Sequence, residues 1–332
     1  MTAISDVATD WLQIDAADTS HSIESAIHSM VRIQLKRKGV VVGLSGGIDS
    51  SVVAALCARA LGSEHVLGLM MPERECSPDS LRLGRILAEY LRIPVVTEDI
   101  TGMLGAIGCY ARRDDAIRQL VPEFSPLHRC KLVMADLAGG ARYSYPSLTV
   151  ETPDGKVEKI HLTSQTYLAI VAASNFKQRL RAVLEYYHAD RLQYAVAGTP
   201  NRLEFDQGFF VKNGDGAGDL KPIAHLYKSQ VRQLADYFQL PVEIRERPST
   251  TDTFSLEQSQ EEFYFGVSLQ AFDLCLYGKN QGLTPEAIAD RTGMACDQVR
   301  AVFVSIDSKR KATAYLHSPP LLVEEVQELF HG

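Results

Sequence analysis

The sequence predicts an α/β fold in which helices flank a doubly wound parallel sheet, and three observations lead to it. Short β-branched or apolar runs at 40–44 and 66–70 are typical of strands that are buried on both faces. Amphipathic segments alternate with such runs along the chain, as they do in β-α-β units. Polar loops that contain glycine follow the strands at 40–44 and 194–199, where the carboxyl ends of parallel strands commonly form a ligand site.

Hydrophobic spacing defines the individual elements. In chain order we expect helix 21–38, strand 40–44, helix 52–61, strand 66–70, helix 80–92, strand 94–97, helix 165–189 and strand 194–199. A helix-turn-helix pattern at 284–299 lacks a basic recognition helix, so we interpret it as a packed helical hairpin.

Composition narrows the class of protein. Apolar residues make up 45% of the 332 residues, enough for a substantial core, and the formal net charge of −7 argues against a nucleic-acid partner. No stretch is long and apolar enough to span a membrane, and the first residues lack the cationic segment of a signal peptide. Six scattered cysteines without a C-x-x-C pair indicate reduced thiols. These features predict a cytoplasmic enzyme.

The loop after the first strand carries the clearest chemical signal, Ser45-Gly46-Gly47-Ile48-Asp49-Ser50-Ser51. Glycines and hydroxyls at a strand-to-helix junction leave backbone N–H groups free to bind an anion. The carboxylate of Asp49 suits phosphate binding only together with a cation such as Mg²⁺. The spacing and lysine of a Walker A motif are missing, as is the dinucleotide fingerprint. A tight connection is the plain alternative, but the sequence favours an ATP site with cleavage at the α-phosphate.

Ser-Gly-Gly-x-Asp-Ser resembles the pyrophosphate loop of the N-type ATP pyrophosphatases, which have a Rossmann-like sheet. A second loop reads G-T-P-N-R-L-E at 198–204 and continues as G-F-F-V-K-N-G-D-G-A-G-D at 208–219 and L-Y-K-S-Q-V-R at 226–232. Together with the first loop, this sequence resembles the NAD synthetase family from about 40 to 320. The resemblance implies ATP-dependent amidation of deamido-NAD by ammonia through an acyl-adenylate, with release of AMP and pyrophosphate.

The resemblance also implies roles for individual residues. Asp49 and Glu204 would hold Mg²⁺, and Asp49, Asp215 and Lys228 would be catalytic, with Asp215 in the ammonia pocket. The plainer alternatives are a solvated helix-start carboxylate for Glu204 and a surface lysine for Lys228. The residues implied for ATP are Gly43, Leu44, Ser45, Gly46, Gly47, Ile48, Asp49, Ser50, Thr199, Lys228 and Ser249. Those implied for deamido-NAD are Arg179, Lys212, Asp219 and Lys309.

Two positions depart from the family pattern. Gln260 stands where the family commonly has an acidic residue, and Ser308 stands where it commonly has a histidine. We expect both departures to affect the recognition of deamido-NAD and not the ATP site.

We expect a single domain over 1–332 with a helical C-terminal segment from about 255. A probable insertion at about 112–161 includes a β-hairpin closed by Asp154-Gly155. It is either a surface feature or an element that covers the site, binds a partner or guides ammonia. The aromatic residues of 263–277 belong to the core or to a dimer interface, and the resemblance implies a homodimer.

Fewer than 40 residues precede the first strand, so we expect no glutaminase domain and a supply of free ammonia or a separate glutaminase subunit. Two other functions stay open. One is an adenylating amidase or thiolase acting on a different substrate, and the other is a nucleotide sensor without catalysis. The joint presence of Asp49, Glu204, Lys228 and Asp215 counts against a sensor.

Overall fold

A parallel four-stranded sheet forms the centre of the computed structural model, which describes residues 10–133, 146–251, 253–324 and 326. The strand order is β3-β2-β1-β7, with β1 (Val40–Gly43), β2 (Val66–Met70), β3 (Val95–Thr97) and β7 (Ala195–Ala197). The chain moves from β1 outward to β3 and then returns to the other side of β1. The sheet is therefore doubly wound as predicted, and its topological switch point lies between β1 and β7.

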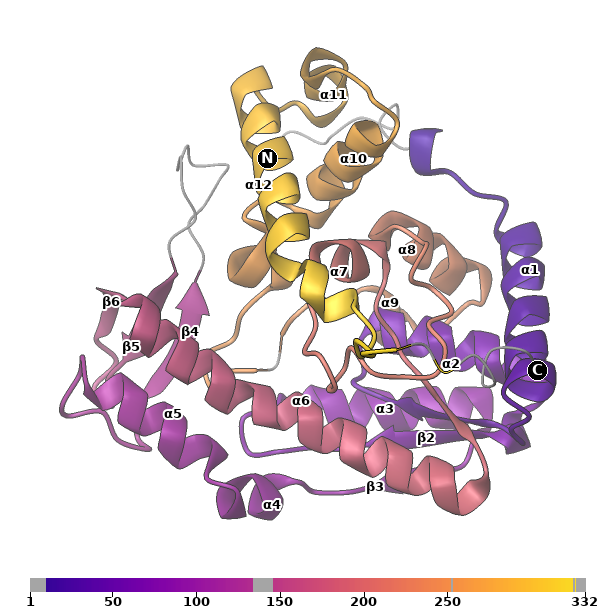
Figure 1. Cartoon of the computed structure of the whole chain (residues 1–332), viewed down its shortest axis with the longest axis horizontal. Helices are drawn as coiled ribbons and strands as arrows, with labels where there is room; N and C mark the ends of the chain where they lie inside the picture. The colour runs from indigo at the N-terminus through magenta and orange to yellow at the C-terminus, as the bar shows by residue number, and fades with distance from the viewer. Residues whose placement is uncertain (1–9, 134–145, 252, 325, 327–332) are drawn as a thin grey trace.

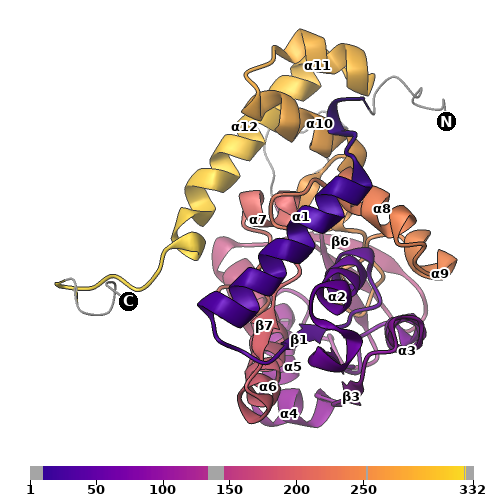
Figure 2. The same ribbon diagram turned by 90° about the vertical axis from the view of Figure 1, so that its right-hand side faces the viewer.

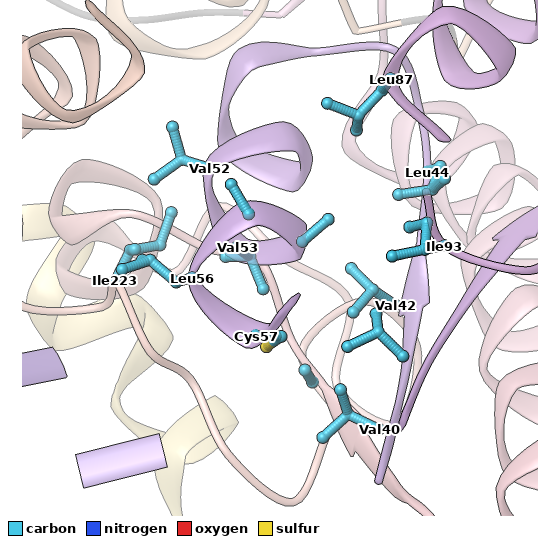
Figure 3. Packing of buried hydrophobic residues seen from close by; sticks show 14 of the residues in the cluster. Val40, Val42, Leu44, Val52, Val53, Leu56, Cys57, Leu87, Ile93 and Ile223 are labelled. Carbon is cyan, nitrogen blue, oxygen red and sulfur yellow. The ribbon is translucent and has the colours of Figure 1, made fainter. Parts of the chain in front are cut away.

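Helices cover both faces of this sheet (Figure 1). Val40 and Val42 pack with α1 (Ala16–His28), α2 (Ile48–Leu61) and α3 (Pro78–Leu91). Figure 3 shows both valines together with side chains of α2 and with Leu87 of α3. Val41, between them, faces the opposite way, toward α6 (Ser164–Leu192). Successive side chains of a strand point to opposite faces, so a strand that is apolar throughout requires both layers of helices.

The helix after β1 begins four residues earlier than the sequence predicted. Gly47 is its N-cap, and the hydroxyls of Ser50 and Ser51 donate to the Gly47 carbonyl at 3.0 and 2.8 Å. Asp49 therefore lies in the first helical turn and not in a loop. Glycine offers no side-chain cap, so this start left no signal in the sequence.

The first predicted helix is also different, since α1 ends at His28 and continues as a wider π-helical turn, η3 (Ser29–Gln34).

The predicted β-hairpin is confirmed as β5 (Ser147–Glu151) and β6 (Val157–His161). The structure adds a third antiparallel strand, β4 (Arg129–Val133), paired with β5. This small sheet packs on α5 (Cys109–Arg118) and on the first turns of α6 through Leu148, Val150 and Ile170. Residues 134–145 of the predicted insertion lie outside the described residues.

The helical C-terminal segment is confirmed by α10 (Leu269–Asn280), α11 (Pro285–Thr292) and α12 (Cys296–Thr313), which lie together at the top of both views (Figure 1, Figure 2). Ile288 and Val299 are fully buried between them, as a packed hairpin requires. Phe265 and Phe272 of the aromatic run belong to this core. Residues 325 and 327–332 of the segment, like 1–9 at the other end, are not described.

The other elements are short and connect these layers. They are η2 (Asp10–Leu12), η4 (Ser63–His65), α4 (Thr101–Ala106), α7 (Arg202–Gln207), α8 (Lys228–Tyr237), α9 (Val242–Arg245), η5 (Glu261–Phe265) and η6 (Ala314–His317). Among the described helices, none combines the length and the apolar character that a membrane span needs.

Candidate functional site

A cavity of about 270 Å³ opens at the carboxyl ends of β1 and β2, next to the switch point. It brings together segments that are far apart in the sequence, namely the ends of both strands, the starts of α2 and α8, α6, and the loops around 199, 215 and 249. The predicted ATP residues line it except Gly46, and so do both predicted metal ligands and Asp215.

The backbone of the segment at 45–51, called the phosphate loop from here on, has a geometry that suits an anion site. Gly46 has a φ of +71°, and a Cβ there would lie 2.8 Å from the Ser80 carbonyl oxygen, so only glycine fits. Ser45 and Ser50 join their hydroxyls at 3.1 Å across the loop, and Gly47 N–H donates to Ser45 Oγ at 3.2 Å. The N-terminus of α2 opens into the cavity, where its free N–H groups and dipole favour a negative charge.

Asp49 and Lys228 form an ion pair at the mouth of this loop. Asn201 donates from Nδ2 to the other oxygen of Asp49 at 3.0 Å, so both carboxylate oxygens have partners. The Lys228 side chain is only 3% exposed, and it extends from the first residue of α8 into the cavity. The alternative of a surface lysine is therefore wrong, because the side chain is buried. Asp49 provides the charged partner that a buried ammonium group requires.

Glu204 occupies the third position of α7 and combines two functions. One oxygen accepts from Asn201 N–H at 3.0 Å and completes a capping box, so the carboxylate does lie at a helix start. The other oxygen accepts from Gln260 Nε2 at 2.9 Å, and Gln260 lines the cavity. The expectation that this departure does not touch the ATP site is therefore wrong. The alternative of a solvated carboxylate is also wrong, because the surrounding protein desolvates Glu204. Burial, with the nearby charge of Asp49, raises the pKa of Glu204 to about 7.

The donor set of this corner suits a small hard cation. Asp49 and Glu204 are carboxylates within electrostatic reach of each other, and Mg²⁺ is commonly held by one or two carboxylates together with phosphate oxygens. A cluster of three or more His, Cys, Asp or Glu side chains that could hold a metal does not occur in the described part of the chain.

A second polar wall comes from α6 and the loop at 208–219. Asp215 accepts from Val211 N–H at 2.7 Å. Desolvation by the surrounding protein raises the pKa of Asp215 to about 6. Gln178, Arg181 and Glu185 of α6 line the same wall. Sequence reasoning missed these three residues, although their spacing of three and four marks one polar stripe on the helix.

The four residues predicted to contact deamido-NAD lie outside the cavity. Arg179 donates to the Lys212 carbonyl at 3.4 Å, and Lys212 Nζ donates to the carbonyls of Tyr315 and Ser318 at 2.7 and 2.8 Å. Asp219 accepts from Val196 N–H at 2.8 Å beside β7. The contacts of Lys309 are of a different kind, because they are made with aromatic residues.

Lys309 Nζ lies 4.4 Å from the centre of the Tyr264 ring and donates to the carbonyl of the same residue at 2.7 Å. Ser308, its neighbour, is exposed. The structure thus places Lys309 in the aromatic core of the C-terminal helices.

Arg247 links the phosphate loop to the start of α3. Its guanidinium donates to the Ser45 carbonyl at 3.1 Å and to Ser80 Oγ at 2.8 Å. The next residues, Pro248 and Ser249, line the cavity as predicted for Ser249. Arg247 is therefore a further polar residue at the site that the sequence analysis did not single out.

A residue of the C-terminal helices caps the helix that begins with Lys228. Asp273 of α10 is 1% exposed and accepts from the first two N–H groups of α8, at 3.1 Å from Lys228 and 2.7 Å from Ser229. A helix N-terminus has no partners of its own for these groups. Asp273 thus supplies the cap that Tyr227 does not provide with a side-chain hydrogen bond to the helix.

We expect Asp273→Ala to destabilise the protein by about 2–3 kcal/mol, because two buried N–H groups lose their acceptor. Urea denaturation measures the change. Asp15→Ala is the matched control, since Asp15 also accepts from two helix N–H groups but on the exposed start of α1. Equal losses in the two variants would show that burial of the cap is unimportant.

Comparisons with known proteins found a family model and relatives that match most of the chain. A family model described as NAD synthase matches residues 19–123 and 147–314. The chain is 52% identical over 322 residues to the NH(3)-dependent NAD(+) synthetase of Rhizobium meliloti (strain 1021), covering 97% of this chain and 96% of that protein. It is 34% identical to the protein of the same name from Methanocaldococcus jannaschii, covering 80% and 82%.

Solved structures share the fold. An NMN synthetase from Francisella tularensis superposes with a TM-score of 0.63 at 21% identity, covering 93% of this chain and 99% of that one. An NH3-dependent NAD synthetase from Campylobacter jejuni in complex with the nitrate ion gives 0.59 at 23% identity, covering 94% and 100%.

Proposed function

The chain belongs to the NAD synthase family, and we infer from this membership that it is a C–N ligase that amidates deamido-NAD with ammonia at the expense of ATP. The carboxylate oxygen of deamido-NAD attacks the α-phosphorus of ATP, and the bond to the pyrophosphate oxygen breaks. Ammonia then attacks the acyl carbon, the bond to AMP breaks, and the amide of NAD remains. The observation that carries this proposal is the Asp49–Lys228 pair at the phosphate loop.

The first step requires stabilisation of negative charge that grows on the departing pyrophosphate. The backbone N–H groups at the start of α2 and the ammonium group of Lys228 converge on the cavity where that charge would lie. Lys228 is held by Asp49 and by its helix, so it is already in place before the charge develops. Thr199 and Ser249, on opposite loops of the cavity, would contact the nucleotide.

Mg²⁺ fits the corner formed by Asp49 and Glu204. When bound, the ion would neutralise phosphate oxygens. The chain contributes the orientation of both carboxylates, because Asn201 hydrogen-bonds to each of them and Gln260 holds the second oxygen of Glu204.

Deamido-NAD would reach the cavity from the side where Arg179, Lys212 and Asp219 lie. These residues gather around α6 and the loop at 208–219, next to the wall that carries Asp215. Their positions outside the cavity suit the remainder of a long dinucleotide better than its reacting carboxylate. Asp215 would face the ammonia that attacks the acyl carbon, and a homodimer is proposed by family resemblance.

A direct assay tests the proposal. Purified protein is incubated with ATP, MgCl₂, deamido-NAD and ammonium chloride, and NAD is followed with alcohol dehydrogenase. We expect NAD and AMP in equal amounts, and much slower NAD formation when glutamine replaces ammonium. Pyrophosphate release that depends on a different carboxylate, with no NAD, would reassign the substrate. Turnover of glutamine as fast as ammonium would contradict the proposed nitrogen donor.

A further inference from the structure

The second half of the reaction releases two protons from the nitrogen. Ammonium must lose one proton before it can attack, since it has no lone pair. The nitrogen loses a second proton after the C–N bond has formed, so that acyl-adenylate and ammonium yield amide, AMP and two protons. One carboxylate can accept only one proton, and a cavity that performs this step benefits from a second acceptor.

Glu185 is placed to be that acceptor. Its side chain extends from α6 into the same wall of the cavity as Asp215, and the two carboxylates are close enough for the charge of Asp215 to act on Glu185. On the far side, the Glu185 carboxylate lies against Gly43, the last residue of β1. A Cβ at Gly43 would come within 2.4 Å of Glu185 Oε1, so glycine at this position makes room for the carboxylate.

Among the described residues, Glu185 differs from the other carboxylates of the cavity because it has no hydrogen-bond or ion-pair partner. Asp49 pairs with Lys228, and Glu204 accepts from two donors. Within residues 10–133, 146–251, 253–324 and 326, no hydrogen bond or ion pair is found for Glu185. A carboxylate that lines a cavity without a protein donor is left to accept from water or from a ligand.

The cation that acts on Glu185 does not form an ion pair with it. Arg181, one turn earlier on α6, has a charge that acts on Glu185, but its guanidinium donates elsewhere, at 3.3 Å to Gln178 Oε1 and at 3.5 Å to the Met71 carbonyl. Burial and the charge of Asp215 outweigh Arg181 and raise the pKa of Glu185 to about 7. A carboxyl with such a pKa exchanges protons readily near neutral pH.

We propose that Glu185 and Asp215 together form the ammonium site, in which Glu185 binds the ion and accepts one of its two protons. This inference rests on the proposed function. Two carboxylates that line one cavity favour a small cation with several N–H donors, and ammonium offers four. Transfer of one proton to Glu185 leaves neutral ammonia between the carboxylates, and Asp215 accepts the proton that the nitrogen loses after attack.

The test uses Glu185→Gln in the full chain, with Glu89→Gln on the exposed face of α3 as the matched control. NAD formation is measured against ammonium chloride concentration. Exchange between pyrophosphate and ATP, measured with deamido-NAD but without ammonium, reports the first half-reaction. We expect the KM for ammonium to rise at least tenfold in Glu185→Gln, while the exchange rate and the KM for ATP stay within twofold. The control should match the unsubstituted protein.

A second nucleophile, hydroxylamine, and the stability of the variant extend the test. Hydroxylamine is mostly neutral at pH 7.5, so its reaction should fall much less than that of ammonium. The thermal midpoint of Glu185→Gln should equal or exceed that of the unsubstituted chain, since an unpartnered charge is removed.

An ammonium KM within twofold of the unsubstituted value would overturn the inference, as would equal losses in exchange and amidation. If the unsubstituted protein forms no NAD from ammonium, the proposed function itself fails and the inference fails with it.

Discussion

Replacing Asp49 by Asn is expected to slow pyrophosphate release by about 10³-fold while the fold is retained. The amide has nearly the same shape and keeps an oxygen to accept from Asn201. It removes the negative charge that pairs with Lys228 and one of the two charged oxygen donors proposed for Mg²⁺. Glu204, which also acts on Lys228, still balances the buried ammonium group, so the loss falls on catalysis more than on stability.

Pyrophosphate release from ATP, with deamido-NAD and ammonium present, measures this effect, and circular dichroism reports the fold. Asp18→Asn is the control, because Asp18 likewise lies in the first turn of a helix, α1, but outside the cavity. Near-normal turnover of Asp49→Asn would remove Asp49 from the metal site and from catalysis.

Replacing Lys177 by Met is expected to lower the free energy of unfolding by about 3–5 kcal/mol, the largest change in stability among these variants. Lys177 is 2% exposed, and its ammonium group lies 2.8 Å from Glu73 Oε1 and 2.7 Å from Glu75 Oε2. A third bond, of 2.8 Å, goes to the Thr253 carbonyl. Methionine fills the space but leaves the buried carboxylates with less positive charge and an acceptor without its donor.

Arg113 also pairs with Glu75, at 2.7 Å, and it lowers the pKa of that carboxyl together with Lys177, against the effect of burial. When Lys177 is replaced, Arg113 still compensates part of the negative charge of the network, and this limits the loss of stability. Urea denaturation measures the change.

Lys156→Met is the comparison, since Lys156 pairs with Glu158 on the exposed β-hairpin, where the same substitution should leave the midpoint almost unchanged. A loss in Lys177→Met no larger than that of the control would contradict this account.

Local patterns predicted the parts of the site that the backbone itself builds. The strand and loop at 40–50 could be placed because an apolar run, two glycines and hydroxyls are local signals. The start of α2 at Ile48 could not be placed, because the cap there is a glycine. The family motifs predicted Glu204, Asp215 and Lys228 as site residues, and the structure places all three at the cavity.

The sequence did not predict contacts between segments that are far apart in the chain. Glu185 was read as one more residue of a long helix, and its closeness to Gly43 depends on how α6 packs across β1. Lys177 gave no sign of burial, because the two carboxylates that pair with it are about a hundred residues earlier in the chain. The placement of Lys309 among aromatic rings depends equally on tertiary packing.

The strand order has a consequence for protein synthesis. β1 pairs with β2 shortly after it in the chain, but its other neighbour, β7, follows only after β3, the antiparallel strands and the whole of α6. A nascent chain that has emerged as far as β3 already holds the phosphate loop but lacks Asn201, Glu204 and Lys228. Non-local parallel pairing is slow to form. The apparatus that splits ATP is thus divided between an early and a late portion of the chain, and nucleotide chemistry begins only when the two are joined beside β1.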